Sequence, residues 1–210
     1  MNRIGLFPLG IVLFPESSYP LHIFEERYKK LINHCIYEKE MFGINFINNS
    51  KLHEVGCAAE IVDVIKRYSD GKIDILVAGI NRYRVVNITE GDSPYLTAQI
   101  EYFEDFEENL NEVLFYDCIE IFNRISENVH SVKIDRIIPN TIKTKMPSFI
   151  IAQKAGLSSE QKQSLIESRS ENWRLEYLIK HLNKLLPIIR ETETIAQIIK
   201  NDGYFTPNKI

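Results

Sequence analysis

The first 35 residues hold the feature that most constrains the fold, an apolar run between two prolines followed by a helical pattern. Residues 7–15 (Phe-Pro-Leu-Gly-Ile-Val-Leu-Phe-Pro) fit a short buried strand that ends at Pro15, because proline has no N–H to donate to a neighbouring strand. A further proline, Pro20, leads into a segment whose apolar residues recur at helical spacing: Phe24, Tyr28, Leu31, Ile32 and Cys35. The sequence therefore predicts a strand, a proline-framed turn and an amphipathic helix.

Short apolar runs dominate the chain from there to about residue 103. Strands are expected over residues 41–47, 56–65, 72–78, 79–86 and 95–102. Asp70-Gly71 favours a two-residue hairpin turn in which both residues have positive φ. Several short strands around one helix, without the crossovers that a parallel sheet needs, predict a small closed or half-open barrel.

The second half of the chain has helical periodicity. It follows an acidic junction over residues 101–112, read most simply as a solvated linker and helix start. Pro147 suits a first helical position, Ser158 with Gln161 fits a capping box, and Gly203 fits a final C-cap. Two apolar stripes predict longer helices, the second kinked or broken at Pro187: Leu110, Leu114, Cys118, Ile121 and Ile125, then Leu175, Leu178, Leu182, Leu185 and Ile189.

We therefore predict an α+β chain with a β-rich subdomain over residues 1–105 and a helical subdomain over residues 106–210. Hydrophobic residues make up 44% and charged residues 26%, values typical of globular proteins, and the net charge is −4. The N-terminus does not resemble a secretory signal, and no apolar run approaches the roughly 20 residues of a membrane helix. We expect a cytoplasmic protein without membrane contact, in which Cys35, Cys57 and Cys118 are buried free thiols.

The sequence offers no catalytic, metal or cofactor site. The five histidines have no metal-ligand spacing, and Ser159 with Lys162 is better explained by the start of a helix than by an acyl-transfer motif. No phosphate-binding loop is present. Arg82 and Arg84 are possible polar contacts for a ligand, although pairing with acids such as Glu60 or Asp63 is the favoured alternative. Trp173 is expected in the helical core.

The order of these segments closely resembles the N-terminal substrate-binding domain of Lon proteases. Residues 79–85 (Gly-Ile-Asn-Arg-Tyr-Arg-Val) are similar to a Gly-x-x-Arg-x-Arg-Val signature that follows the central hairpin of that family. Residues 56–65, 95–98, 150–152, 157–163 and 174–178 resemble further family segments, so the likeness extends from about residue 4 to about residue 190. It implies a PUA-like pseudo-barrel followed by a helical bundle.

The resemblance also implies a function. Complete Lon proteases continue into an ATPase and a serine–lysine peptidase, which this sequence lacks. The resemblance therefore implies a non-catalytic module. Such a module would recognise non-native or degron-bearing proteins for a Lon-type or other ATP-dependent protease. The alternatives are an adaptor that docks on a partner ATPase or protease, and a PUA-like RNA-binding protein, which the negative net charge disfavours.

Candidate contact residues lie in the first irregular connection, because loops on a rigid scaffold often carry function. The adjoining polar helix face would complete the surface. Phe14 and Leu21 have an alternative role as plugs for the end of the barrel. The expected substrate-binding residues are Phe14, Pro15, Tyr19, Pro20, Leu21, Glu25, Glu26 and Lys29.

Overall fold

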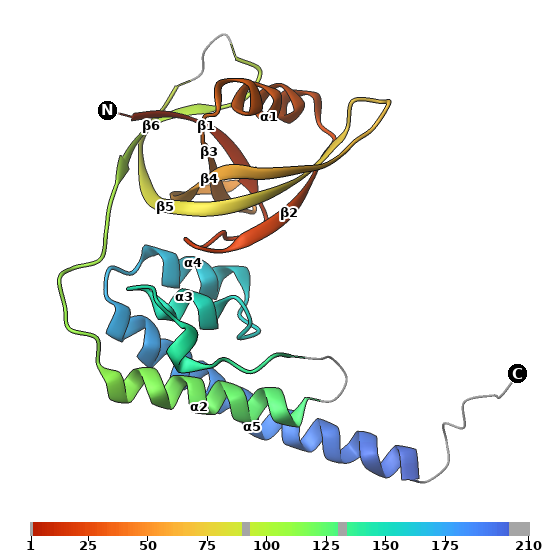
Figure 1. Cartoon of the computed structure of the whole chain (residues 1–210), viewed down its shortest axis with the longest axis vertical. Coiled ribbons are helices and arrows are strands. Elements are labelled where there is room, and N and C mark those ends of the chain that lie inside the picture. The colour runs from red at the N-terminus through yellow and green to blue at the C-terminus, as the bar shows by residue number, and fades with distance from the viewer. Residues whose placement is uncertain (1, 90–92, 130–133, 202–210) are drawn as a thin grey trace, which may run out of the picture. The chain divides into compact units, whose positions relative to one another are not determined.

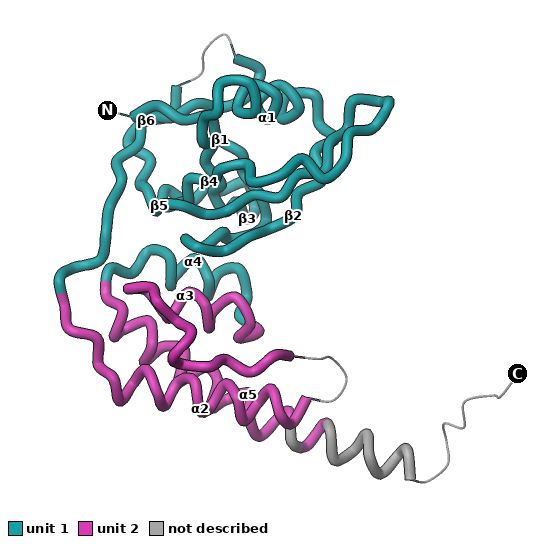
Figure 2. The backbone as a smooth tube through the Cα atoms, in the orientation of Figure 1, with its two compact units in different colours: residues 1–107, 157–169 teal, residues 108–156, 170–210 magenta. Residues whose placement is uncertain are grey.

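The structure, a computed structural model, describes residues 2–89, 93–129 and 134–201 (Figure 1). The chain forms two compact units (Figure 2). Unit 1 comprises residues 1–107 and 157–169, and unit 2 comprises residues 108–156 and 170–210. The first change of unit lies two residues beyond the predicted boundary, but residues 157–169, which we expected in the helical half, belong to unit 1.

Unit 1 is built on a mixed sheet that closes on itself. The spatial order is β2-β5-β4-β3-β1-β6. Strand β5 also pairs with β6, so the strands from β5 to β6 in this order form a closed ring. This closure agrees with the predicted barrel and leaves β2 as an added strand on β5. The strands are β1 (Asn2–Leu9), β2 (Ser18–Ile23), β3 (Phe42–Asn48), β4 (Lys51–Arg67), β5 (Ile73–Thr89) and β6 (Thr97–Tyr102).

The expectation that parallel pairing is absent is wrong at one place, because β1 pairs with β3 in parallel. The chain between these strands includes helix α1 (Glu26–Glu38), which supplies the length that a parallel connection requires. Alternation places Ile73, Ile75 and Val77 of β5 in the core, as their spacing predicted. The two predicted strands over residues 72–86 form one continuous strand, β5.

Three turns differ from the predictions. The first strand ends at Leu9, and Pro15 instead precedes Glu16 (φ 60°) in a turn closed by Ser17 N–H donating to Phe14 O at 3.2 Å. Between β3 and β4, both Asn49 (φ 47°) and Ser50 (φ 63°) have positive φ, so this is the tight hairpin turn. At the predicted turn, only Gly71 has positive φ, at 82°.

Helix α4 (Ser159–Glu167) belongs to unit 1 and begins with the predicted capping box of Ser158 and Gln161. It is attached to the sheet by side-chain hydrogen bonds. Gln163 donates from Nε2 to Val55 O at 3.0 Å, and Asn48 donates from Nδ2 to Glu160 Oε1 at 2.8 Å. Sequence periodicity identified this helix but could not assign it to a unit.

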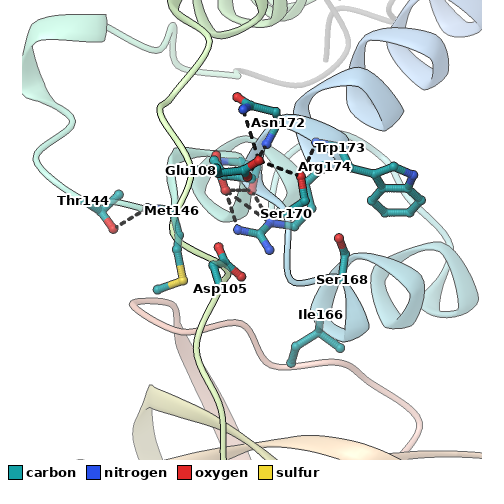
Figure 3. Close-up of polar contacts among 12 residues, drawn as sticks. Asp105, Glu108, Thr144, Met146, Ile166, Ser168, Ser170, Asn172, Trp173 and Arg174 are labelled. Atoms are coloured by element: carbon teal, nitrogen blue, oxygen red, sulfur yellow. Dashed lines mark hydrogen bonds and ion pairs between the residues drawn. The ribbon is translucent and has the colours of Figure 1, made fainter.

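Unit 2 contains α2 (Glu112–Asn128), the 3-10 turn η1 (Pro139–Thr141), α3 (Pro147–Ala152) and α5 (Glu171–Asn201). Glu108 holds the start of α5 by accepting hydrogen bonds from Ser170 and Asn172 (Figure 3). Pro187 lies inside α5, whereas Gly203 lies outside the described residues. Trp173 is 43% exposed and its ring lies tilted against that of Tyr177, with the ring centroids 5.3 Å apart, so its expected place in the core is wrong.

The α2 stripe is only partly correct. Cys118 and Ile125 are buried, but Leu110 precedes the helix and is exposed, and Phe115 and Phe122 fill the core instead. Within the described ranges, no helix combines the length and apolar character needed to cross a membrane.

Candidate functional site

The structure divides the predicted contact residues into core and surface. Phe14 is 2% exposed, and Pro15 and Leu21 are also buried, so their assignment as substrate contacts is wrong. Leu21 lies opposite Ile75 in the β2–β5 ladder and shares its inward face, which explains its burial. The alternative role for Phe14 and Leu21, filling the core, agrees with the structure.

Tyr19 and Pro20 are exposed, and both belong to β2. Tyr19 lies opposite Val77 and is 42% exposed, while Pro20 lies opposite Leu76 on the other face of the sheet. Strand β2 therefore presents an apolar side chain on each of its two faces rather than one contiguous patch.

A polar and aromatic cluster continues from β2 across the outer face of β5. The Asp74 carboxylate accepts a hydrogen bond from the Tyr68 hydroxyl at 2.7 Å and lies 2.5 Å from His22 Nδ1. The hydrogen bond from Tyr68, followed by that from His22, lowers the pKa of Asp74 below its usual value. Phe24 stacks on His22 and is 57% exposed.

Sequence reasoning missed this cluster because it placed Phe24 on the helix, whereas α1 begins at Glu26. Phe24 lies outside the helix as an exposed aromatic beside β2. The alternation of exposed His22 with buried Leu21 and Ile23 is the sequence signal that could have found the outer face.

The three predicted polar residues of the helix start form surface ion pairs. Glu25 pairs with Arg27 at 2.8 Å, and Glu26 pairs with Lys29 at 2.8 Å. Lys29 also donates to Asp70 O at 3.2 Å, which links α1 to the β4–β5 turn. Their role in binding remains a prediction.

Two exposed apolar residues of β4 lie on the other side of β5 from β2. Val62 and Ile65 coincide with register shifts in the β4–β5 ladder, where an extra residue interrupts regular pairing. These shifts break the in–out alternation, so the run over residues 61–65 is not buried along its whole length.

Arg82 and Arg84 have different roles. Arg82 is 2% exposed, donates to Ile166 O at 3.1 Å and pairs with Asp105, so it is unavailable to a ligand. Arg84 is exposed and lies 3.5 Å from Glu54. The prediction that the two side chains share a solvated face is wrong, because Arg82 is buried and only Arg84 is exposed. The acids that lie beside them are Asp105 and Glu54 rather than the suggested Glu60 or Asp63.

A cavity of about 310 Å³ in unit 1 is lined by two cations, two carboxylates and three further residues: Lys51, Arg84, Glu54, Glu167, Leu52, His53 and Val55. Its two cations, Lys51 and Arg84, equal its two carboxylates, Glu54 and Glu167, in number. Across the described part of the chain, no group of three or more His, Cys, Asp or Glu is placed to hold a metal.

The cysteines are free and buried, as predicted. Burial raises the pKa of Cys57 and of Cys118 to about 12, and that of Cys35 to about 11. A thiol with such a pKa carries little thiolate at neutral pH, so none of the three is suited to nucleophilic chemistry.

Comparison with known proteins gives a consistent result. The family described as "ATP-dependent protease La (LON) substrate-binding domain" matches residues 3–184. The Lon protease of Syntrophus aciditrophicus (strain SB) is 23% identical over 91% of this chain, and that of Escherichia coli (strain K12) is 24% identical over 94%. The chain spans 26% and 27% of the lengths of these two relatives.

Two solved structures share the fold. A Lon N-terminal domain protein from Xanthomonas campestris superposes with a TM-score of 0.68 at 22% identity, covering 86% of this chain and 98% of that one. The N-terminal domain of a Mycobacterium avium complex Lon protease gives a TM-score of 0.70 at 17% identity, with 87% and 98% coverage.

Proposed function

The chain belongs to the Lon (ATP-dependent protease La) substrate-binding domain family, and we propose that it binds non-native polypeptides without cleaving them. The observation that carries this proposal is the exposure of apolar side chains along β2. Tyr19, Pro20 and Phe24 are exposed beside a sheet whose core is otherwise well filled. Folded proteins bury most such side chains, whereas non-native chains offer them as contacts.

The surroundings of β2 suit reversible capture. The apolar side chains are interrupted by His22, Asp74 and the ion-paired start of α1, so the surface is apolar in small areas and polar around them. Small apolar areas give modest affinity per contact, which allows a non-native chain to be released.

A non-catalytic role agrees with the chemistry of the described residues. The thiols have raised pKa values, and the polar cavity contains ion-paired side chains. We propose that a captured chain is passed to a Lon-type or other ATP-dependent protease in the cytoplasm. Recognition of degron tags would use the same surface.

RNA binding is the less favoured function. A PUA-like barrel would favour RNA binding, but the net charge of −4 opposes contact with a phosphate backbone. Arg82, which the sequence suggested as a polar contact, is engaged inside unit 1.

The experiment that tests this proposal compares one protein in two states. Fluorescence anisotropy would follow labelled α-lactalbumin, either native or permanently unfolded by reduction and carboxymethylation, as this protein is added. We expect saturable binding of the unfolded form only. Equal binding of both forms, or binding of neither, would refute capture of non-native chains, and a salt-sensitive shift of structured RNA would favour the alternative.

A further inference from the structure

We infer that β2 receives an extended segment of the substrate as an additional β-strand, paired through the main chain. This inference rests on the proposed function and specifies the substrate's conformation and its mode of contact. Strand β2 is the last strand in the order β2-β5-β4-β3-β1-β6, so only one of its edges is paired.

The direction of the main-chain groups of β2 follows from its ladder with β5. Gly79 N–H donates to Ser17 O at 2.8 Å, so Ser17 lies at a bonded position opposite β5. In an antiparallel ladder, bonded positions alternate with positions whose N–H and C=O point away. The main-chain groups of Ser18, Pro20 and His22 therefore point to the free edge.

Pro20 supports this assignment independently. Proline has no N–H, so it is tolerated in a sheet only where that N–H would face away from the partner strand. The register places Pro20 opposite Leu76 without interrupting the ladder from Ser18↔Ala78 to Ile23↔Ile73. The free edge consequently offers carbonyls at residues 18, 20 and 22 and N–H groups at residues 18 and 22.

This edge is accessible and regular. Ser18, Tyr19, Pro20 and His22 are all exposed, and no main-chain hydrogen bond links residues 18, 20 or 22 to any described residue outside the β2–β5 ladder. The ladder of β4 with β5 is different, because it shifts register at Val62 and Ile65. Such shifts disrupt regular pairing and protect an edge from strand addition.

A non-native chain is the occupant that fits this edge. It has free main-chain groups in an extended conformation, and β2 can bind them without regard to sequence. A second copy of this chain fits less well, because pairing of two β2 edges would bring in two copies of Pro20 and so remove two donors. Pairing of β2 with a substrate strand involves one copy of Pro20 and so removes only one donor.

Side chains on both faces of β2 would add contacts to such a strand. Alternate residues of the added strand would lie beside Tyr19 on one face and beside Pro20 and His22 on the other. This arrangement gives a use to apolar side chains that are divided between two faces. It favours segments in which apolar residues are frequent, without requiring a fixed motif.

The test uses the full chain and a fluorescein-labelled octapeptide of alternating valine and serine. Two further peptides carry N-methyl groups, one on every odd residue and one on every even residue. Only alternate residues of an added strand face β2, so we expect one N-methylated peptide to lose about tenfold or more in affinity while the other binds like the parent. Equal affinities for all three peptides, or no binding of the parent, would overturn the inference.

Variants of β2 provide the reciprocal test. Ser18→Pro removes an outward N–H, and Ser18→Ala is the matched control that removes the side chain but keeps the donor. We expect Ser18→Pro to weaken binding of the octapeptide and of unfolded α-lactalbumin by about tenfold, and Ser18→Ala to leave both unchanged. His22→Pro, compared with His22→Ala, repeats the test at a second position if Ser18→Pro does not fold.

The outcomes separate this inference from the proposed function. Unchanged binding of unfolded α-lactalbumin to folded Ser18→Pro and His22→Pro would overturn strand addition and leave substrate capture in place. Failure of the unmodified protein to bind unfolded α-lactalbumin would overturn both. A concentration-dependent dimer that Ser18→Pro abolishes would assign the edge to a second copy and overturn the inference.

Discussion

The guanidinium of Arg82 on β5 pairs with the carboxylate of Asp105, which lies 23 residues further along the chain. The same guanidinium donates to the carbonyls of Ile166 and Ser168 at the end of α4. A cation at a helix C-terminus satisfies carbonyls that have no partner within the helix and interacts favourably with the helix dipole. Arg82 thus joins three separate segments of unit 1.

This arrangement predicts a large loss of stability in Arg82→Ala. Removing one partner of a buried pair leaves the other charge uncompensated, so we expect a loss of about 3–5 kcal/mol in the free energy of unfolding. Urea denaturation measures it. Arg84→Ala is the matched control, because the exposed Arg84–Glu54 pair should contribute no more than ~1 kcal/mol. Similar losses in the two variants would contradict the role assigned to Arg82.

The β3–β4 turn predicts a stabilising substitution. Asn49 and Ser50 both have positive φ, a conformation that costs a residue with a Cβ more than it costs glycine. Ser50→Gly should therefore raise the free energy of unfolding by about 0.5–1 kcal/mol. Ser50→Ala, which keeps the Cβ, should not. A loss of stability in Ser50→Gly would show that the turn does not hold Ser50 in this conformation.

The thiols should be inert in the folded protein. With pKa values of about 11 for Cys35 and about 12 for Cys57 and Cys118, almost no thiolate forms at pH 8, and burial blocks access of the reagent. A disulfide reagent such as DTNB should release colour only after denaturant is added. Rapid reaction of any thiol with the native protein would contradict this burial.

Asp74 should make the stability of the folded protein depend on pH in the acidic range. Its pKa is lowered in the folded state, first by the Tyr68 hydroxyl and then by His22. A carboxyl whose folded pKa is lowered stabilises the protein above its ordinary pKa of 3.8, and this contribution disappears as the pH falls through the lowered value. Melting temperatures of the unmodified protein and Asp74→Asn should therefore differ at pH 6 and converge once the pH falls below the lowered pKa of Asp74. A constant difference would contradict the proposed linkage.

Local patterns in the sequence predicted the elements whose causes are local. The capping box of Ser158 and Gln161 was recognised because both of its hydrogen bonds join residues three apart. The inward face of β5 followed from strict alternation of branched residues. The closed sheet was predicted from several short apolar runs, although β4 and β5 are each 17 residues long. The sequence did not indicate the parallel pairing of β1 and β3.

The wrong predictions concern residues whose burial or conformation depends on contacts with residues far away in the sequence. Arg82 has the sequence environment of a surface cation, but carbonyls 84 and 86 residues away compensate its burial. The Asp-Gly sequence at residues 70–71 led to the prediction of a tight turn there, and the turn at Asn49-Ser50 was missed, although asparagine also tolerates positive φ. Phe14 and Tyr19 both lie near prolines in an apolar segment, and the sequence pattern does not distinguish them. Phe14 is buried, whereas Tyr19, near the start of β2, is 42% exposed although it lies opposite the buried Val77.

The most direct test of substrate capture at β2 is an anisotropy titration of unfolded, carboxymethylated α-lactalbumin with the double variant Tyr19→Ser/Phe24→Ser. We expect its affinity to fall by about tenfold or more, ~1.4 kcal/mol, with an unchanged melting temperature, because both side chains are exposed. Trp173→Ser, which removes an exposed aromatic from unit 2, should bind like the unmodified protein. Full affinity in the double variant, or an equal loss in Trp173→Ser, would contradict capture at β2.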